Sequence, residues 1–340
     1  MYDPIKHALT LYDITVKAIE YLNDDRDVAR VTDEGGRSYF LKLYGKANDY
    51  DIIPGQRVYH TRPQIQAETE ILLLLAEGGF KTARPVKNSG GQYVTELPDD
   101  ADGEPMYATV TSFIDAAPME RLQPHMTELA YSTGQAAARL HLESQKLLNA
   151  IAVKRPHKRQ AYAEAIRARL TGAAQTGILT AAQLVMLGQC CDIIIDCMNR
   201  LDFEPAANVG LVHTDIIHGN CFVAPDEVIL VDFSRSVYSY YLYDLAEMCL
   251  HGDFGGISPM LQNAMLRGYH SLKPLTADQL FCMQVMFVLF ILTVMAESLD
   301  AAQNEWRDNV LVWLADKVLP GLVSGQGYMK EEAFAGLLAP

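Results

Sequence analysis

Hydrophobic periodicity divides this chain of 340 residues into two parts, and this division constrains the fold more than any other feature. Residues 27–44 contain two strand-like runs around a glycine turn, and further strand-like segments follow at 92–97 and 107–114. Residues 63–79 begin with proline and end with two glycines, as helices do. From about residue 124 the pattern becomes helical, apart from one short hairpin. We therefore predict an α+β fold with a small β-rich lobe followed by a larger helical lobe.

Composition and charge narrow the possible functions. The formal net charge of −14 argues against a nucleic-acid partner, because it would repel a phosphate backbone. Six cysteines without metal-site or disulfide spacing indicate buried thiols in a reducing compartment. The most apolar run, at 280–296, contains a glutamine and lacks basic flanks, so a buried helix fits it better than a membrane span. Because the N-terminus also lacks a signal-peptide pattern, we predict a cytoplasmic protein without a membrane partner.

The short hairpin at 221–231 is flanked by polar residues. Its two apolar runs surround a Pro-Asp turn, so they should pair antiparallel. Such pairing would bring Asn220 and Asp232 together, with backbones on the order of 5 Å apart. An amide oxygen and a carboxylate suit Mg²⁺, which prefers oxygen ligands and often shares them with a phosphate. Asp215 lies in the loop before the hairpin and is placed to act as a base.

Two other interpretations of this stretch stay open. His213, Asp215 and His218 could ligate zinc, but no second histidine motif accompanies them. A polar turn beside a buried hairpin would explain any single residue, although it does not explain the whole set of spacings. For His213 alone this simpler interpretation is favoured, with the residue orienting the loop by hydrogen bonding.

The spacing of Asp215, Asn220 and Asp232 resembles that of the catalytic loop of the protein-kinase fold. The residues around them are more similar to those of the aminoglycoside phosphotransferase and choline kinase-like family. Residues 213–220, HTDIIHGN, keep the key positions of that family's H-G-D-x-H-x-x-N, except that Thr214 replaces glycine. Residues 231–234, VDFS, match its I-D-F-G, with serine in place of glycine. The segments GQAAARLH (134–141) and YLYDLAEM (241–248) are similar to two of its helices.

The resemblance implies a two-lobed protein kinase-like fold. A nucleotide-binding lobe would occupy residues 1–114, and a helical lobe with the catalytic hairpin and the acceptor site would occupy 115–340. The hinge of the family falls at 110–115, where Ser112 and Ile114 would contact the purine through their backbone.

Lys42 falls at the family's phosphate-binding lysine. Taken alone, this lysine would be read as one whose end reaches solvent, because it lies on a strand of alternating residues. The resemblance implies instead that it binds the α and β phosphates and pairs with a helix glutamate. Glu68 shares the apolar face of the helix at 63–77, whereas Glu70 lies nearer the opposite side, so we choose Glu68.

The implied reaction transfers the γ-phosphoryl group of ATP or GTP to a hydroxyl of a small molecule. Asp215 would orient that hydroxyl and take its proton, while Lys42 would neutralise and position the phosphates. Asn220 and Asp232 would hold Mg²⁺. Asp244 would brace the loop without taking part in the chemistry.

Acidic and aromatic residues after position 233 favour a cationic acceptor, such as an aminoglycoside or a choline-like amine. Metabolite alcohols, including amino-acid and sugar hydroxyls, stay open, because such tyrosines are often core residues and such acids often lie on the surface. The residues in question are Tyr238, Tyr240, Tyr241, Tyr243, Glu247, Asp253, Glu297 and Asp300.

Three departures from the family pattern leave a second class of function open. Residues 21–31 lack the glycines expected over the phosphates, and Thr214 and Ser234 replace two more. A catalytically weak, kinase-like nucleotide-binding or scaffold protein is therefore the alternative. Retention of the lysine, both aspartates and the asparagine argues for an enzyme. No A-P-E-like segment follows Phe233, so a protein kinase is not favoured.

Overall fold

A computed structural model describes most of the chain, and its packing divides into two units. Of the described residues, the first unit contains those up to Ala117 together with Val231–Arg235, and the second contains Pro118–Leu230 and those from Ser236 onwards. The predicted boundary at residue 114 stays a prediction. The described residues are 3–45, 61–98, 103, 105–120, 125–147, 155–173, 177–250, 258–297 and 305–337.

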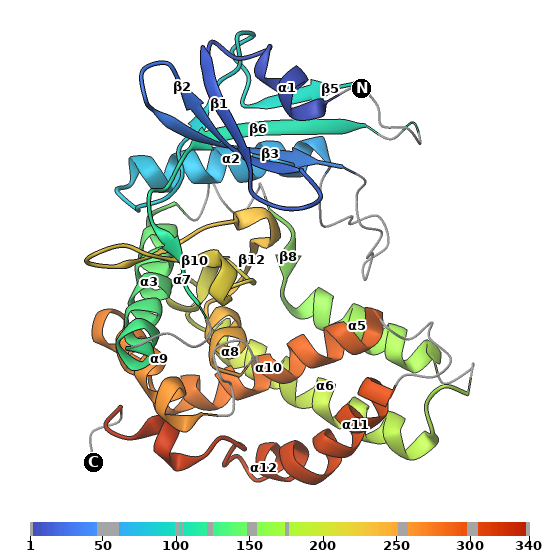
Figure 1. Ribbon diagram of the computed structural model, residues 1–340. Helices are drawn as coiled ribbons and strands as arrows, with labels where there is room; N and C mark the ends of the chain where they lie inside the picture. Colours follow the sequence, from blue (N-terminus) through green and yellow to red (C-terminus); the bar gives the residue numbers. More distant parts are fainter. Residues whose placement is uncertain are drawn as a thin grey trace. The chain divides into compact units, whose positions relative to one another are not determined.

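The first unit is built on a six-stranded antiparallel sheet (Figure 1). The strand order is β1-β2-β3-β6-β4, and β5 also pairs with β6. The predicted hairpin at 27–44 is confirmed as β2 and β3, and Gly36 adopts a φ of 81° at their turn, where glycine has no steric cost. The strands are β1 (Val16–Tyr21), β2 (Val28–Asp33), β3 (Ser38–Tyr44), β4 (Pro85–Val86), β5 (Val94–Leu97) and β6 (Met106–Ser112).

Two helices, α1 (Pro4–Leu9) and α2 (Arg62–Glu77), cover opposite faces of this sheet (Figure 1). The pleat of β3 explains this, because successive side chains of a strand point to opposite faces. Leu43 belongs to the core that α1 covers, whereas its neighbour Tyr44 packs with Ile65 of α2. The helix predicted at 63–77 is confirmed as α2, which carries proline in its first turn and ends before two glycines.

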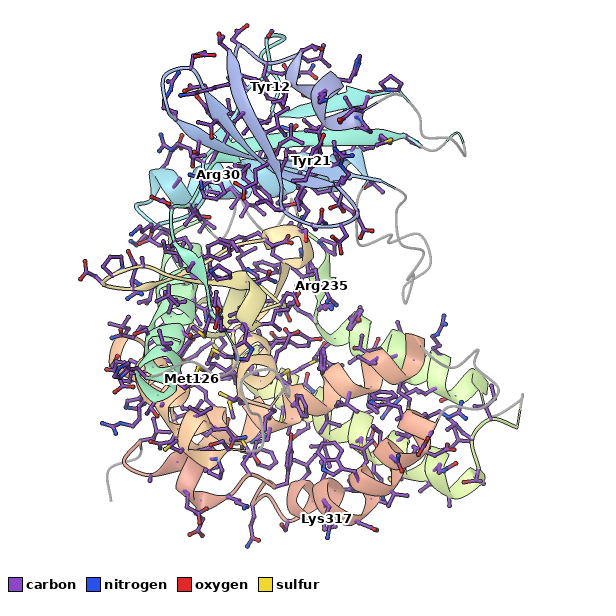
Figure 2. All side chains as sticks on the ribbon, viewed as in Figure 1. Tyr12, Tyr21, Arg30, Met126, Arg235 and Lys317 are labelled. Carbon is purple, nitrogen blue, oxygen red and sulfur yellow. The ribbon has the colours of Figure 1, made fainter. Side chains whose placement is uncertain are left out.

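The second unit is mainly helical and contains two small three-stranded sheets, ordered β11-β10-β7 and β8-β12-β9. The predicted hairpin after residue 220 is confirmed, since β10 and β11 pair antiparallel with Cys221 opposite Leu230. Its short strands are β7 (Ala117–Pro118), β8 (His157–Lys158), β9 (Val209–Val212), β10 (Cys221–Val223), β11 (Val228–Leu230) and β12 (Val237–Tyr240). Its helices are α3 (Met126–Lys146), which begins at the residue labelled in Figure 2, α5 (Gln160–Ala173), α6 (Ala181–Leu201), α7 (Pro205–Asn208), α8 (Leu242–Leu250), α9 (Pro259–Leu272), α10 (Ala277–Glu297), α11 (Glu305–Trp313) and α12 (Leu319–Val323).

The apolar run at 280–296 lies in α10. Thr276 and Gln279 form a reciprocal cap at its start, because each side chain accepts a hydrogen bond from the other's backbone N–H. By length and composition, α6 and the segment Ala277–Ala296 of α10 are each apolar enough to cross a membrane. In the latter, 72% of the most apolar window is buried inside the protein, so this helix is largely buried, but not fully buried as the sequence predicted.

A close crossing of α3 and α9 organises the core of the second unit. Gly134 of α3 and Gly268 of α9 lie at the contact point. A Cβ atom on Gly134 would lie 1.9 Å from the carbonyl oxygen of Met265, and one on Gly268 would lie 1.9 Å from that of Tyr131. Only glycine fits at both positions, so the backbones approach each other directly. Gly134 begins the GQAAARLH segment, and this contact gives that residue a physical role.

Candidate active site

The loop between β9 and β10 carries Asp215, and Asn220 fixes the position of its side chain. The amide nitrogen Nδ2 of Asn220 donates to the carboxylate oxygen Oδ2 of Asp215 at 2.9 Å and to its backbone oxygen at 3.0 Å. A 3₁₀ turn at His218–Asn220 leads from this loop into β10. Because both bonds use the Asn220 nitrogen, the amide oxygen faces away from Asp215 and is available as a ligand.

Asp244 braces this loop from α8. Its fully buried carboxylate accepts the backbone N–H groups of His213 at 2.8 Å and Thr214 at 2.7 Å. Thr214 has a φ of 57°, a left-handed conformation that costs a β-branched residue about 1–2 kcal/mol. Each hydrogen bond to a charged group contributes about 1.5–3 kcal/mol, so the two bonds outweigh that strain. The predicted bracing role of Asp244 is therefore confirmed.

Lys42 of β3 forms an ion pair with Asp232 within the first unit. Its Nζ lies 2.9 Å from both carboxylate oxygens, and the two side chains are 20% and 36% exposed. Burial raises the pKa of Asp232, but the charge of Lys42 together with hydrogen bonds from Lys42 and Ser234 outweighs burial and lowers that pKa to about 2. Burial likewise opposes the charge on Lys42, yet Tyr44, Asp232 and Glu68 together hold the pKa of its ammonium group above its ordinary value. Both groups are charged at neutral pH.

The segment around Asp232 is anchored by the next residue, Phe233. Phe233 is fully buried, and its ring meets that of Phe80 edge to face at 6.4 Å between centroids. Asp232 itself has a φ of 60°, which aspartate tolerates better than most residues, and the Ser234 N–H donates to its Oδ1 at 3.3 Å. The serine that replaces the family's glycine thus has a backbone contact with the carboxylate.

Glu68 is the inward-facing acid of α2, as predicted. It is 6% exposed, and the Tyr44 hydroxyl lies 3.4 Å from its Oε2. Glu70 instead accepts a hydrogen bond from Gln66 on the same helix at 2.8 Å. The charge of Glu68 raises the pKa of Lys42, whose direct ion-pair partner is Asp232.

The predicted hinge residues lie at the end of β6 and just beyond it. The Ser112 N–H donates to the Arg84 carbonyl at 2.8 Å, and its hydroxyl accepts from the Arg84 N–H at 2.9 Å. The Ile114 carbonyl accepts from Ala116 at 2.9 Å. The N–H of Ser112 is therefore already used, and its carbonyl oxygen accepts a hydrogen bond from the Thr111 hydroxyl at 3.4 Å. The purine-binding role of both residues stays a prediction.

The site chemistry suits Mg²⁺ better than zinc. Within the described ranges, no group of three or more His, Cys, Asp or Glu side chains could hold a metal ion, so the zinc interpretation of His213, Asp215 and His218 is not supported. Asn220 offers an amide oxygen and Asp232 an ionised carboxylate, and Mg²⁺ usually takes only one or two protein oxygens beside phosphates and water. Each donor atom by itself suits Mg²⁺, and the binding of one ion by both residues stays a prediction.

Three of the four tyrosines expected to contact the acceptor are core residues, whereas Tyr238 is half-buried. Tyr240, Tyr241 and Tyr243 are at most 1% exposed. Their rings already face cations of the chain itself. The contacts, measured to the ring centroid, are Arg159 to Tyr240 at 5.7 Å, Lys273 to Tyr241 at 5.2 Å and Lys158 to Tyr243 at 5.3 Å. An acceptor cannot stack on them, so that part of the expectation is wrong. Asp253 and Asp300 lie outside the described residues, as does the side chain of Glu297.

Three residues with clear contacts at the site had no role in the sequence interpretation. Tyr44 lies beside Lys42 and Glu68, and its position two residues after Lys42 on the same strand face was the available signal. His141 contacts Asp244, and it ends the GQAAARLH segment that resembles the family. Tyr269 contacts His141, and no sequence pattern pointed to it.

A sheet unit with a paired lysine and aspartate, and a helical unit with a braced aspartate–asparagine loop, define a small-molecule kinase with a protein kinase-like fold. The chain belongs to the phosphotransferase enzyme family, which matches residues 15–279. The predicted α+β class, the protein kinase-like fold and the enzyme class are therefore confirmed.

Known proteins similar to this chain are kinases of small molecules. A homoserine kinase from Methylobacillus flagellatus is 24% identical over 260 residues, which span 73% of this chain and 68% of that protein. An amicoumacin kinase, solved with AMP-PNP and Ca²⁺, has a TM-score of 0.65 at 19% identity, over 96% of this chain and 95% of its own. A microcompartment-associated aminopropanol kinase has a TM-score of 0.65 at 16% identity, over 96% and 98%. These two structures share the fold.

Proposed function

We propose that this protein transfers the γ-phosphoryl group of ATP or GTP to a hydroxyl of a small molecule, with Asp215 as the base. The observation that carries this proposal is the contact of Asn220 with the Asp215 carboxylate at 2.9 Å, in a loop whose backbone Asp244 holds. A carboxylate fixed in this way can orient a hydroxyl for in-line attack and take up its proton. Catalysis of phosphoryl transfer consists mainly of positioning and charge stabilisation, so few groups are needed.

The other predicted residues have matching roles. Lys42 neutralises and positions the nucleotide phosphates, and Glu68 with Tyr44 keeps its ammonium group charged and in place. Asn220 and Asp232 would hold Mg²⁺, which when bound would offset the negative charge of the phosphates. Ser112 and Ile114 contact the purine through backbone groups. In the absence of nucleotide, Lys42 forms an ion pair with Asp232. This pairing keeps the Asp232 carboxylate ionised, which is the form that binds Mg²⁺.

We further propose that the acceptor is a small alcohol that also carries an amine. The named substrates of two similar proteins, homoserine and aminopropanol, each carry a hydroxyl and an amine, and homoserine carries a carboxylate as well. The formal net charge of −14 on this chain favours the approach of a cation. The buried tyrosines of the second unit do not contribute to this argument, because their rings face lysines and arginine of the chain itself.

The test is a release assay for ADP or GDP with the full chain, Mg²⁺ and a panel of acceptors. The panel contains aminopropanol, ethanolamine, choline, homoserine and an aminoglycoside, and ³¹P NMR identifies any phosphate ester that forms. We expect turnover that depends on one amino alcohol, together with a Mg²⁺-dependent rise in Tm with ATP or GTP. A rise in Tm without turnover on any acceptor would favour the weak kinase-like binding protein. No rise with either nucleotide would contradict the proposal.

A further inference from the structure

A line of buried polar contacts connects α9 to the loop that carries Asp215. The Tyr269 hydroxyl lies 2.9 Å from Nδ1 of His141, and Nε2 of His141 lies 3.0 Å from the Asp244 carboxylate. Tyr269, His141 and Asp244 are all 0% exposed. Asp244 in turn accepts the N–H groups of His213 and Thr214, the two residues immediately before Asp215.

The direction of each hydrogen bond follows from the charges. Burial raises the pKa of Tyr269 well above its ordinary value, so its hydroxyl stays protonated and can donate. Burial also lowers the pKa of His141, although Asp244 opposes this, so the imidazole is neutral at physiological pH. A neutral imidazole donates from one nitrogen only, and the Asp244 carboxylate requires that donor at Nε2. Nδ1 is therefore an acceptor, and the Tyr269 hydroxyl donates to it.

We propose that Tyr269 is a positioning residue for phosphoryl transfer, acting through His141 and Asp244 on the backbone of Thr214. The hydroxyl fixes the tautomer and orientation of the imidazole, which holds one oxygen of the Asp244 carboxylate. That carboxylate holds Thr214 at a φ of 57°, and Asp215 follows directly. Glycine would adopt this conformation without support, but threonine needs the hydrogen bonds that Asp244 accepts from the loop backbone. This inference rests on the proposed role of Asp215.

The crossing of α3 and α9 places the tyrosine accurately. Gly268, the neighbour of Tyr269, allows the backbone of α9 to meet that of α3. His141 lies on α3 seven residues after Gly134, two helical turns along the same face. Tyr269 therefore reaches His141 from a backbone that close packing fixes on both sides, and this makes its hydroxyl a rigid support.

Tyr241 offers a matched control on the same imidazole. Its ring stacks on His141 at 4.4 Å between centroids, but its hydroxyl lies 3.0 Å from Ser144 and takes no part in the line to Asp244. Tyr269→Phe and Tyr241→Phe thus each remove one buried hydroxyl beside His141. Only the first removes a hydrogen bond to the ring.

The experiment compares these two variants with the wild-type protein, at a temperature where circular dichroism shows that all three are folded. We expect kcat to fall roughly tenfold to a hundredfold in Tyr269→Phe, with the nucleotide KM within about twofold, because Asp215 is misplaced. Hydrogen exchange at the His213 and Thr214 amides should become faster in this variant only. Equal kcat in both variants, or unchanged exchange, would overturn the proposal.

Thr214→Gly separates backbone positioning from general loss of stability. In the Thr214→Gly background, the kcat ratio between Tyr269→Phe and its parent should shrink to about threefold or less, because glycine adopts the left-handed conformation without support. An unchanged ratio would show that Tyr269 does not act through the backbone of Thr214. Hydrogen exchange does not depend on the reaction. It therefore still tests whether Tyr269 supports the hydrogen bonds of Asp244 to the His213 and Thr214 amides, even if Asp215→Ala proves fully active and the proposed function fails.

Discussion

The Asn220 side chain holds Asp215 by two bonds from one nitrogen, at 2.9 Å to the carboxylate and 3.0 Å to the backbone oxygen. This leaves the Asn220 oxygen free of Asp215, so one side chain can orient the base and still offer a ligand to a hard cation. The two roles assigned to this short loop are thus compatible in one geometry. Both roles depend on the loop backbone, whose His213 and Thr214 N–H groups donate to Asp244.

Replacing the base should separate chemistry from nucleotide binding. In Asp215→Ala we expect kcat to fall by roughly 10²–10⁴, because the acceptor hydroxyl loses its proton acceptor. The Mg²⁺-dependent Tm rise with nucleotide should stay close to that of the wild type. Asp226→Ala, which removes an exposed acid from the hairpin turn, is the control and should keep full turnover. Full turnover in Asp215→Ala would show that another group takes the proton.

Loss of the strand lysine should weaken both nucleotide binding and transfer. We expect kcat/KM for the nucleotide to fall roughly a hundredfold in Lys42→Met, since a preorganised positive charge on the phosphates is removed. Lys17→Met changes an exposed lysine on β1 and serves as the matched control for loss of one positive charge. Equal kinetic constants in the two variants would rule out a phosphate contact for Lys42.

The ion pair of Lys42 and Asp232 predicts a pH dependence of stability. The pKa of Asp232 is about 2 in the folded protein, against about 3.9 for an unfolded chain. Its contribution to stability is therefore complete above about pH 4 and is lost as the pH falls toward 2. The pair is partly exposed and screened by solvent, so we expect less than about 1 kcal/mol.

Urea unfolding of the wild type and Asp232→Asn at several pH values tests this dependence. The difference in their free energies of unfolding should be larger at pH 5 than at pH 2.5, because at pH 2.5 Asp232 is protonated in the unfolded chain and must lose this proton to form the ion pair on folding. A difference that stays constant over this range would show that the pair does not stabilise the fold. Lys17→Met should show no such change with acidity.

The elements that the sequence predicted correctly depend on local signals. Pro63 and the glycine pair at 78–79 define α2 without help from the rest of the chain. Asp215 and Asn220 are also close in sequence, so their spacing alone indicated that they form one loop.

The contacts that the sequence did not predict join residues that are distant along the chain. Lys42 and Asp232 are 190 residues apart, and the pairing of His141 with Tyr269 spans 128. A histidine on an amphipathic helix and a tyrosine on another carry no signal that they will meet. Their contact follows from the glycine crossing of α3 and α9, which is a property of the packed unit. The expected contact of the buried tyrosines after residue 237 with an acceptor is wrong for the same reason, since sequence alone does not show which side chains cover a ring.

The same crossing gives a test of the fold itself. Gly134→Ala places a Cβ atom 1.9 Å from the Met265 carbonyl oxygen, so α9 must shift away from α3. We expect the free energy of unfolding to fall by roughly 2–3 kcal/mol or more, with a loss of about 2–4 °C in Tm for each kcal/mol. Urea unfolding and calorimetry measure both quantities.

Gly188→Ala in α6 is the matched control for a glycine-to-alanine change within a helix. Apart from the nearby backbone of α6 itself, no heavy atom lies within 4 Å of the added Cβ, so alanine should stabilise the helix by roughly 0.5–1 kcal/mol through its lower backbone entropy in the unfolded chain. The two substitutions should therefore change stability in opposite directions. If Gly134→Ala were as stable as Gly188→Ala, the helices would not cross at backbone contact, and Tyr269 would lose the rigid support that places it against His141.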